Sequence, residues 1–275
     1  MRPRALLRRH AALGDVEAPG PRPLPPPGPL VRWARPLLLP VSSVIRAAAA
    51  EPVLSLTYDD GPHPRQTPEL LDVLAEHGAR VTFFVLTDRA REHPRLVGRL
   101  LAAGHEVAVH GTDHARLADL PAADAVRRLR RARDVLQDVA GRPVHLYRPT
   151  YGALTVTTAL AAGVLGLTPV LWSAWGLDWV DAPAQDVVGR VVGALHPGAI
   201  VLLHETTDDQ ETLGSGTAPR FSRADVARGV LAGMRAQGYA SVPVGELLER
   251  YPAVRAVSLA RWAGPVRRAG RVRPS

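Results

Sequence analysis

Two adjacent carboxylates and two closely spaced histidines are the first chemical signal in the sequence. Asp59 and Asp60 end the apolar run in "LSLTYDDGPHP", and His110 and His114 lie four residues apart in "VHGTDH". Paired carboxylates repel each other unless a metal or a proton compensates their charge. Two imidazoles and one carboxylate make a ligand set typical of catalytic Zn²⁺, which keeps positions open for water and substrate. The other carboxylate then remains available to accept a proton.

These residues lie at the ends of predicted strands. Short apolar runs alternate with amphipathic stretches and predict strands at residues 53–58, 81–86, 106–110, 144–148, 168–172, 199–204 and 240–244. Such a series of βα repeats indicates a parallel sheet and favours a closed or nearly closed α/β barrel. An open doubly wound sheet is the alternative, although no glycine-rich phosphate loop follows the first strand. In a barrel, chemistry is expected at the carboxyl ends of the strands.

Further polar and aromatic residues follow the same rule. Arg148 ends the fourth predicted strand, Trp172 the fifth and His204 the sixth. Asp178 and Trp179 stand in the stretch after the fifth strand. A single histidine at a strand end is more often structural, but reactive side chains at several strand ends favour one shared site.

Five short stretches in order resemble the motifs of the polysaccharide deacetylase group, also called the NodB-homology or carbohydrate esterase 4 family. They are "LTYDDGP", "HGTDH", "RPTYG", "DW" and "VLLH", and the likeness covers roughly residues 52–249. The resemblance implies a distorted (β/α)7-type barrel with parallel strands, the NodB-homology fold. It also implies a metal-dependent hydrolase of carbon–nitrogen bonds. Such an enzyme removes an N-acetyl or N-formyl group from an amino sugar in a polysaccharide, lipid-linked or nucleotide-linked glycan.

The first two motifs carry the metal and the base. The resemblance implies that Asp59 is the catalytic base and that Asp60, His110 and His114 hold a divalent metal. Zn²⁺ is the expected ion, with Co²⁺ as a second choice.

The other three motifs supply the remaining roles. By the same resemblance, Arg148 orients the base, His204 is the general acid, and Asp178 tunes that histidine. Substrate contacts are expected from side chains around the barrel mouth, namely Tyr151, Trp172, Trp179 and Leu202.

Some positions depart from the family pattern. Gly111 stands where the second motif usually has Ser or Thr, with Thr112 as a substitute hydroxyl, and Thr150 replaces the second Pro of Arg-Pro-Pro. No proton-transfer group or metal ligand is lost, so we expect these changes to affect substrate preference more than activity. A hydrolase of a cyclic amide or imide is the alternative function, and a non-catalytic carbohydrate-binding protein is a third.

Charge and composition divide the chain of 275 residues into three parts. Residues 1–50 are basic and proline-rich, with eight Arg against two acids, and are expected to be partly disordered or packed on the surface. Residues 51–249 form the predicted catalytic barrel, and residues 250–275 are a basic tail with seven Arg and no acid. The barrel region is therefore acidic, which argues against a nucleic-acid partner. The basic ends could instead contact an anionic membrane or another polyanion, while a compositional bias towards Arg is the alternative explanation.

The N-terminal stretch does not predict a secretory signal. Its apolar run is interrupted by Arg8 and Arg9 before a hydrophobic core can form. We therefore expect the protein in the cytoplasm or peripherally at the inner membrane face, with export as the open alternative. The chain has no cysteine, so any metal must bind to His, Asp or Glu.

Overall fold

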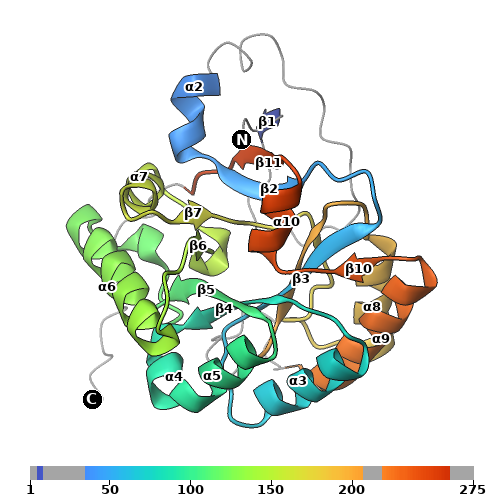
Figure 1. Ribbon diagram of the computed structural model, residues 1–275. Coiled ribbons are helices and arrows are strands. Elements are labelled where there is room, and N and C mark those ends of the chain that lie inside the picture. Colours follow the sequence, from blue (N-terminus) through green and yellow to red (C-terminus); the bar gives the residue numbers. More distant parts are fainter. Residues whose placement is uncertain (1–4, 9–34, 207–218, 261–275) are drawn as a thin grey trace, which may run out of the picture.

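A curled parallel sheet forms the centre of the structure, a computed structural model that describes residues 5–8, 35–206 and 219–260 (Figure 1). The strand order is β7-β6-β5-β4-β3-β9-β8, and β10 pairs in parallel with the start of β3. The strands are β3 (Val53–Asp59), β4 (Thr82–Leu86), β5 (Glu106–Gly111), β6 (Leu146–Tyr147), β7 (Thr168–Pro169), β8 (Ala174–Trp175), β9 (Ile200–His204) and β10 (Ala240–Ser241). This parallel half-barrel confirms the predicted distorted (β/α)7-type fold.

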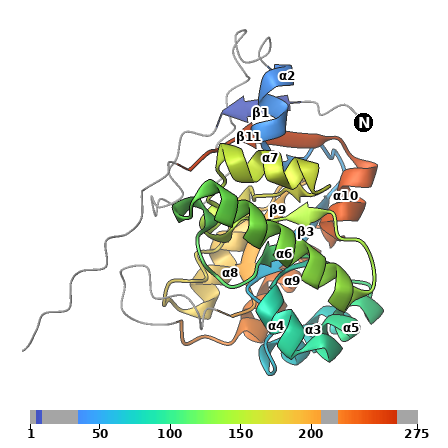
Figure 2. The same ribbon diagram turned by 90° about the vertical axis from the view of Figure 1, so that its left-hand side faces the viewer.

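Helices surround the outer face of the half-barrel (Figures 1 and 2). They are α3 (Gln66–Glu76), α4 (Thr87–Glu92), α5 (Pro94–Ala102), α6 (Ala122–Ala140), α7 (Val156–Val164), α8 (Ala184–Gly193) and α9 (Arg223–Ala236). Capping side chains and left-handed glycines mark the ends of some of these helices. Ser222 caps α9 by accepting the N–H of Asp225, and Gly141, with a φ of 64°, ends α6.

Alternation along the strands decides which side chains face the interior. In β3, Leu56 and Tyr58 belong to the core cluster packed against the outer helices. The side chain of Asp59 therefore faces inward. In β9, Leu202 belongs to the inner cluster, and His204, two residues later, points the same way.

Strands from both ends of the sequence pack on this half-barrel. β2 (Ser43–Ala47), β11 (Ala253–Val257) and β1 (Ala5–Arg8) form a second sheet in the order β1-β11-β2. Isolated bridges join Val44 to Val170, after β7, and Arg46 to Ala199, before β9. β2 therefore links the two sides of the half-barrel. The predicted division at residues 50 and 250 stays a prediction, and most of both terminal segments lies outside the described residues.

Short helical segments complete the fold. They are α2 (Arg35–Leu38), the 3₁₀ helices η1 (Leu39–Val41), η2 (Leu117–Asp119) and η3 (Thr150–Gly152), and α10 (Val244–Arg250). α10 closes the amino-terminal end of the half-barrel. Its Val244 N–H donates to Thr82 Oγ1 at 2.8 Å, and its Gly245 N–H donates to Glu106 Oε2 at 3.0 Å.

Several strand boundaries differ from the prediction, and the fourth strand is only Leu146–Tyr147 instead of residues 144–148. β7 ends at Pro169 instead of residue 172, because the chain turns to β2, where the Leu171 N–H donates to the Val44 carbonyl at 2.8 Å. Ala174 and Trp175 form β8, which the sequence analysis did not predict. The last predicted strand, 240–244, is only Ala240–Ser241, because α10 begins at Val244.

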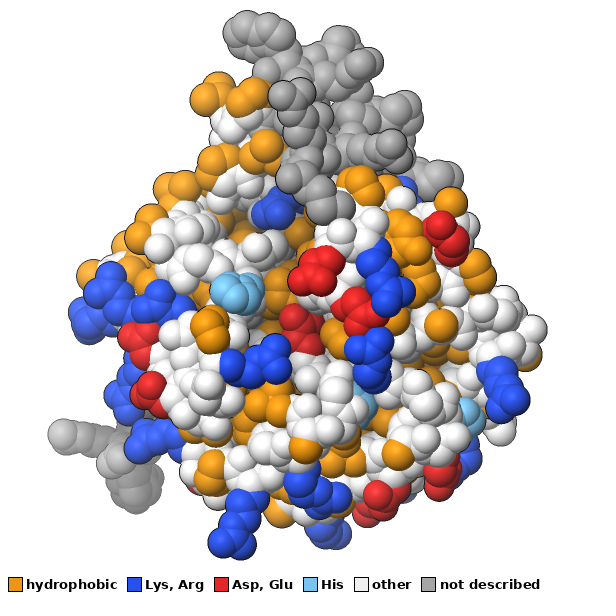
Figure 3. Space-filling view, in the orientation of Figure 1, with side chains coloured by type: hydrophobic (Ala, Val, Ile, Leu, Met, Phe, Trp, Pro, Cys, Tyr) orange, Lys and Arg blue, Asp and Glu red, His pale blue; other side chains and the backbone are white. Residues whose placement is uncertain are grey.

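The surface is charged over most of the outer helices. Figure 3 shows acidic and basic side chains spread over this face, whereas hydrophobic side chains gather along the edge over α2 and α7. Among the described helices, none combines the length and apolar character needed to cross a bilayer.

A close approach between β2 and the start of β9 gives a stability prediction. Gly198 has a φ of +73°, and a Cβ there would lie 2.1 Å from the Ala47 carbonyl oxygen. Gly166 has nearly the same φ, +72°, but nothing lies within 4 Å of its Cβ position. We expect Gly166→Ala to cost about 1 kcal/mol through backbone strain alone. Gly198→Ala should cost about 2 kcal/mol more, because strands must separate.

Urea or thermal unfolding of both glycine variants measures this difference. Equal losses of unfolding free energy at positions 198 and 166 would contradict the close packing of β2 on the half-barrel.

Candidate active site

Asp59 and His204 are neighbours across two parallel strands. Both end their strands, and their Cα atoms are paired in the register of β3 with β9. Both side chains are buried, with exposed fractions of 2% and 7%. The structure thus brings together a carboxylate and an imidazole that are 145 positions apart in the sequence.

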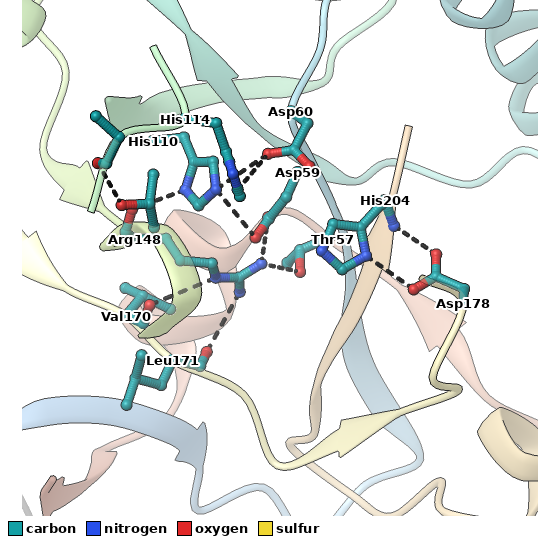
Figure 4. Close-up of polar contacts among 12 residues, drawn as sticks. Thr57, Asp59, Asp60, His110, His114, Arg148, Val170, Leu171, Asp178 and His204 are labelled. Carbon is teal, nitrogen blue, oxygen red and sulfur yellow. Dashed lines mark hydrogen bonds and ion pairs between the residues drawn. The ribbon is translucent and has the colours of Figure 1, made fainter. Parts of the chain in front are cut away.

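Arg148 holds the carboxylate of Asp59 in place (Figure 4). Its Nη1 donates to Asp59 Oδ1 at 2.6 Å and to Thr57 Oγ1 at 2.7 Å. The other guanidinium nitrogens donate to the carbonyls of Val170 and Leu171 at 3.4 and 3.3 Å. Arg148 is fully buried, so a charged partner is required. Arg148 therefore contacts Asp59 directly, and its role in orienting the base stays a prediction.

A left-handed turn sets the direction of Asp60. Strict alternation would send the side chain after Asp59 to the outer face of the sheet. Asp60 instead has a φ of 74°, which is uncommon for a residue with a side chain. Its carboxylate points to the two histidines (Figure 4). This turn directs the two adjacent carboxylates to different partners, Asp59 to Arg148 and Asp60 to the two histidines.

Asp60, His110 and His114 form a group that can hold a metal ion. Nε2 of His110 lies 3.2 Å from Asp60 Oδ1, and Nε2 of His114 lies 3.3 Å from the same oxygen. Ligand atoms of a tetrahedral Zn²⁺ site with bonds near 2.0–2.1 Å are about 3.3 Å apart. The spacing therefore fits a divalent cation.

The hydrogen bond on the far side of His110 supports this assignment. Its Nδ1 donates to the Arg148 carbonyl at 2.8 Å, so the neutral ring presents a lone pair at Nε2. That lone pair faces the Asp60 carboxylate, an arrangement that needs positive charge between the two. In the metal-free protein, protonated histidines supply such charge: burial raises the pKa of Asp60, but the hydrogen bond from protonated His110 and the charges of both histidines hold it well below its usual range. Asp60 is thus an anion, the form that a metal ligand requires.

The loop that carries His114 is braced by residues that differ from the prediction. Thr112 was the expected substitute for a hydroxyl at Gly111, but its Oγ1 has no hydrogen-bond partner among the described residues. Thr150 takes this role, since its Oγ1 donates to the Ala115 carbonyl at 2.8 Å. Asp113 also accepts the Ala115 N–H at 3.2 Å. A Cβ at Gly111 would lie 2.8 Å from the Asp113 carbonyl oxygen, so a side chain at this position would require the loop to shift.

His204 is held by Asp178 through two hydrogen bonds. Asp178 Oδ1 lies 2.8 Å from His204 Nδ1, and Oδ2 accepts the His204 backbone N–H at 2.7 Å. Burial alone would lower the pKa of His204, but the Asp178 carboxylate outweighs it and raises the pKa above its ordinary value. Nδ1 is engaged, so the proton that His204 can give to a ligand is on Nε2.

Arg223 is a contributor that the sequence analysis missed. Its Nη1 donates to the Asp178 carbonyl at 2.7 Å and to Asp178 Oδ2 at 3.1 Å, and the residue is buried. Burial raises the pKa of Asp178, but the charges of His204 and Arg223 lower it below its ordinary value. No local motif marks Arg223, which lies in an arginine-rich chain at the start of α9.

The interaction of Asp178 with His204 predicts a change in pH dependence. The acid role requires protonated His204, so activity falls as pH rises through the pKa of this imidazole. Asp178→Asn removes the charge that raises this pKa. The alkaline limb of the kcat profile should therefore move to lower pH, and kcat measured across the pH range checks it. Asp181→Asn, a nearby and more exposed carboxylate, should leave that limb in place; an unmoved limb in Asp178→Asn contradicts the role.

The predicted substrate-binding residues surround one pocket beside these groups. Its lining contains Asp59, His110, His114, Pro149, Tyr151, Gly152, Trp172, Trp179, Leu202 and His204. The rings of Tyr151 and His114 have centroids 4.5 Å apart, and Trp179 meets His204 edge-on at 5.4 Å. The structure therefore brings His110, His114, Asp59, His204 and the four predicted substrate-binding residues to a single opening.

Comparison with known proteins agrees with this geometry. Residues 46–170 match the model of the polysaccharide deacetylase family. A chitooligosaccharide deacetylase of Sinorhizobium fredii is 37% identical over 164 residues, which span 59% of this chain and 76% of that protein.

Solved structures agree as well. The peptidoglycan deacetylase PdaC of Bacillus subtilis is 30% identical with a TM-score of 0.63, covering 73% of this chain and 91% of that one. A family 4 carbohydrate esterase of Streptomyces lividans, in complex with acetate, is 25% identical with a TM-score of 0.60, covering 71% and 92%. The chain belongs to the polysaccharide deacetylase family, and it is a hydrolase of non-peptide carbon–nitrogen bonds.

Proposed function

We propose that this enzyme removes N-acetyl groups from amino sugars in a chitooligosaccharide or a peptidoglycan strand, using a divalent metal. The observation that carries the proposal is the convergence on one pocket of a metal-ligand group, an anchored carboxylate and an anchored imidazole. The relatives with the corresponding names supply the two substrate classes.

The metal is proposed to be held by Asp60, His110 and His114. Two imidazoles and a carboxylate favour Zn²⁺, and the same ligand types also accept Co²⁺. When bound, such an ion supplies a Lewis acid that polarises the acyl carbonyl and makes water a better nucleophile near neutral pH.

Asp59 is proposed to act as the base. Its Oδ1 is fixed by Arg148, and its Oδ2 lies 3.8 Å from His110 Nε2. The carboxylate therefore stands beside the metal-ligand group, where it takes a proton from the water that attacks the acyl carbon. Fixing the base before substrate arrives avoids a reorganisation cost during the reaction.

His204 is proposed to complete the reaction from the neighbouring strand β9. Its Nε2–H gives a proton to the amide nitrogen as the carbon–nitrogen bond breaks, so that a neutral amine leaves instead of an amine anion. Acetate and the free amino sugar are the products. Asp178 and the edge of Trp179 hold the imidazole in the orientation that this transfer requires.

A substrate panel tests the proposal. Purified protein loaded with Zn²⁺ or Co²⁺ is incubated with N-acetylated chitooligosaccharides and with peptidoglycan fragments, and released acetate is measured. N-formylated sugars and a cyclic imide serve as comparison substrates. We expect acetate release from at least one glycan, reduced strongly in His204→Ala.

Two outcomes would contradict the assignment. One is cyclic imide hydrolysis without any deacetylation by the metal-loaded enzyme. The other is glycan binding without acetate release, which is the behaviour expected of a non-catalytic carbohydrate-binding protein.

A further inference from the structure

The solvent side of α7 is apolar. Five exposed residues form this side, here called the α7 face, and none of them is charged: Val156, Thr157, Leu160, Gly163 and Val164. The exposed fractions of its three large apolar residues are 49%, 47% and 85% in that order. The sequence contains no charged residue between Arg148 and Asp178. Surface helices normally turn polar side chains to water, so a face of this kind indicates a partner.

Basic side chains border the α7 face. α6 packs beside α7, and Nη1 of Arg133 in α6 donates to the carbonyl of Leu165, directly after α7, at 3.1 Å. α6 contains five Arg and three Asp, and its Arg130 and Arg131 are exposed. Figure 3 shows this arrangement as hydrophobic side chains over α2 and α7 that end at a basic cluster over α6.

Both basic ends of the sequence join the described chain next to α7. On one side, η1 contacts α7 and follows α2, whose Leu37 is 77% exposed. On the other side, the Ala260 N–H donates to the Leu154 carbonyl, two residues before α7, at 2.7 Å. Residues 1–34 contain six Arg and two acids, and residues 261–275 contain five Arg and no acid. The described chain therefore connects to both basic segments beside the apolar face.

We propose that the α7 face docks the protein on an anionic lipid surface. The side chains of Val156, Leu160 and Val164 enter the apolar part of the interface, and the surrounding arginines bind the headgroups. An apolar helix face bordered by basic residues is the pattern of interfacial membrane binding. Each arginine near an anionic surface adds attraction. A second copy of the chain fits less well, because two positively charged borders would repel each other.

This docking brings the substrate pocket near the lipid. Tyr151 and Gly152 line the pocket, and α7 begins only four residues after Gly152. Together with the proposed function, the arrangement favours glycans that lie beside a membrane or are attached to it. Membrane docking can be measured without any substrate. Its test is therefore independent of whether the enzyme deacetylates glycans.

Vesicle binding tests the proposal. The full chain is sedimented with vesicles of phosphatidylcholine alone or of phosphatidylcholine mixed with phosphatidylglycerol. We expect binding to the mixed vesicles, weakened by salt, and little binding to the neutral ones. Val164→Glu should bind about tenfold more weakly, because it removes an apolar contact and adds a charge of the lipid's own sign.

Ala75→Glu is the matched control, since it places the same charge at an exposed position on α3. It should bind vesicles as the unchanged chain does, and both variants should deacetylate a soluble oligosaccharide normally. Equal binding by Val164→Glu and the unchanged chain overturns the proposal, as does equal loss in both variants. A change of oligomeric mass in Val164→Glu, seen by light scattering, also overturns it by showing that a second copy covers the face.

Discussion

Asp59→Asn is expected to lower kcat by about 10³-fold, within the range of 10²–10⁴ that a positioned base contributes. The amide retains the size of the carboxylate and an oxygen that can accept the bond from Arg148, but it cannot take a proton from water. The loss should appear in kcat with a smaller change in KM, because the substrate contacts of the pocket remain. Acetate release under saturating substrate measures it.

The same substitution leaves the Arg148 guanidinium buried without its carboxylate partner. Breaking a buried ion pair costs about 3–5 kcal/mol, so the assay temperature must lie well below the unfolding midpoint of the variant. Asp72→Asn, an exposed position on α3, is the control for the chemical change itself and should keep full activity. A folded Asp59→Asn variant with undiminished kcat would exclude Asp59 as the base.

The residues that end strands were predictable from the sequence. Apolar runs fix the strands, and parallel strands bring their carboxyl ends to one edge, so Asp59, His110 and His204 had to meet. Arg148, which directly follows β6, shares this edge: its N–H donates to the Val109 carbonyl at 2.9 Å. The prediction succeeded because a periodic pattern determined these positions.

The residues that hold those side chains were not predictable in the same way. Arg223 meets Asp178 across 45 positions, and Thr57 meets Arg148 across 91. Neither contact leaves a local pattern, since each depends on how two distant elements pack. The brace at Thr150 was read only as a departure from the family motif, yet its hydroxyl supports the loop that carries His114.

The sequence patterns also did not predict the two strands, β2 and β8, that help to close the half-barrel. β2 lies within residues 1–50, which were expected to be partly disordered or packed on the surface, and β8 has only two residues. Short strands gain their stability from tertiary packing, here from the burial of Val44 and Ile45 in the inner core cluster. Local composition therefore could not indicate them.

Metal binding should stabilise the folded protein against unfolding and should also activate the enzyme. An ion that binds only the folded state adds about 2.7 kcal/mol when present at a hundred times its dissociation constant. For a domain of this size, that corresponds to a rise in Tm of about 5–10 °C. We expect Zn²⁺ or Co²⁺ to produce this rise in the chelator-treated protein and to restore deacetylation in parallel.

Single variants locate the ion within the site. His114→Ala removes one of the three ligands and should lose most of the Tm rise, whereas His145→Ala, at an exposed position, should keep it. Asp59→Asn should keep the rise while losing turnover, because Asp59 lies beside the ligand group without belonging to it. A rise of equal size in His114→Ala and the unchanged chain would mean that the ion binds elsewhere. In that case Asp60 would not be a metal ligand, and the proposed difference in role between Asp59 and Asp60 would be wrong.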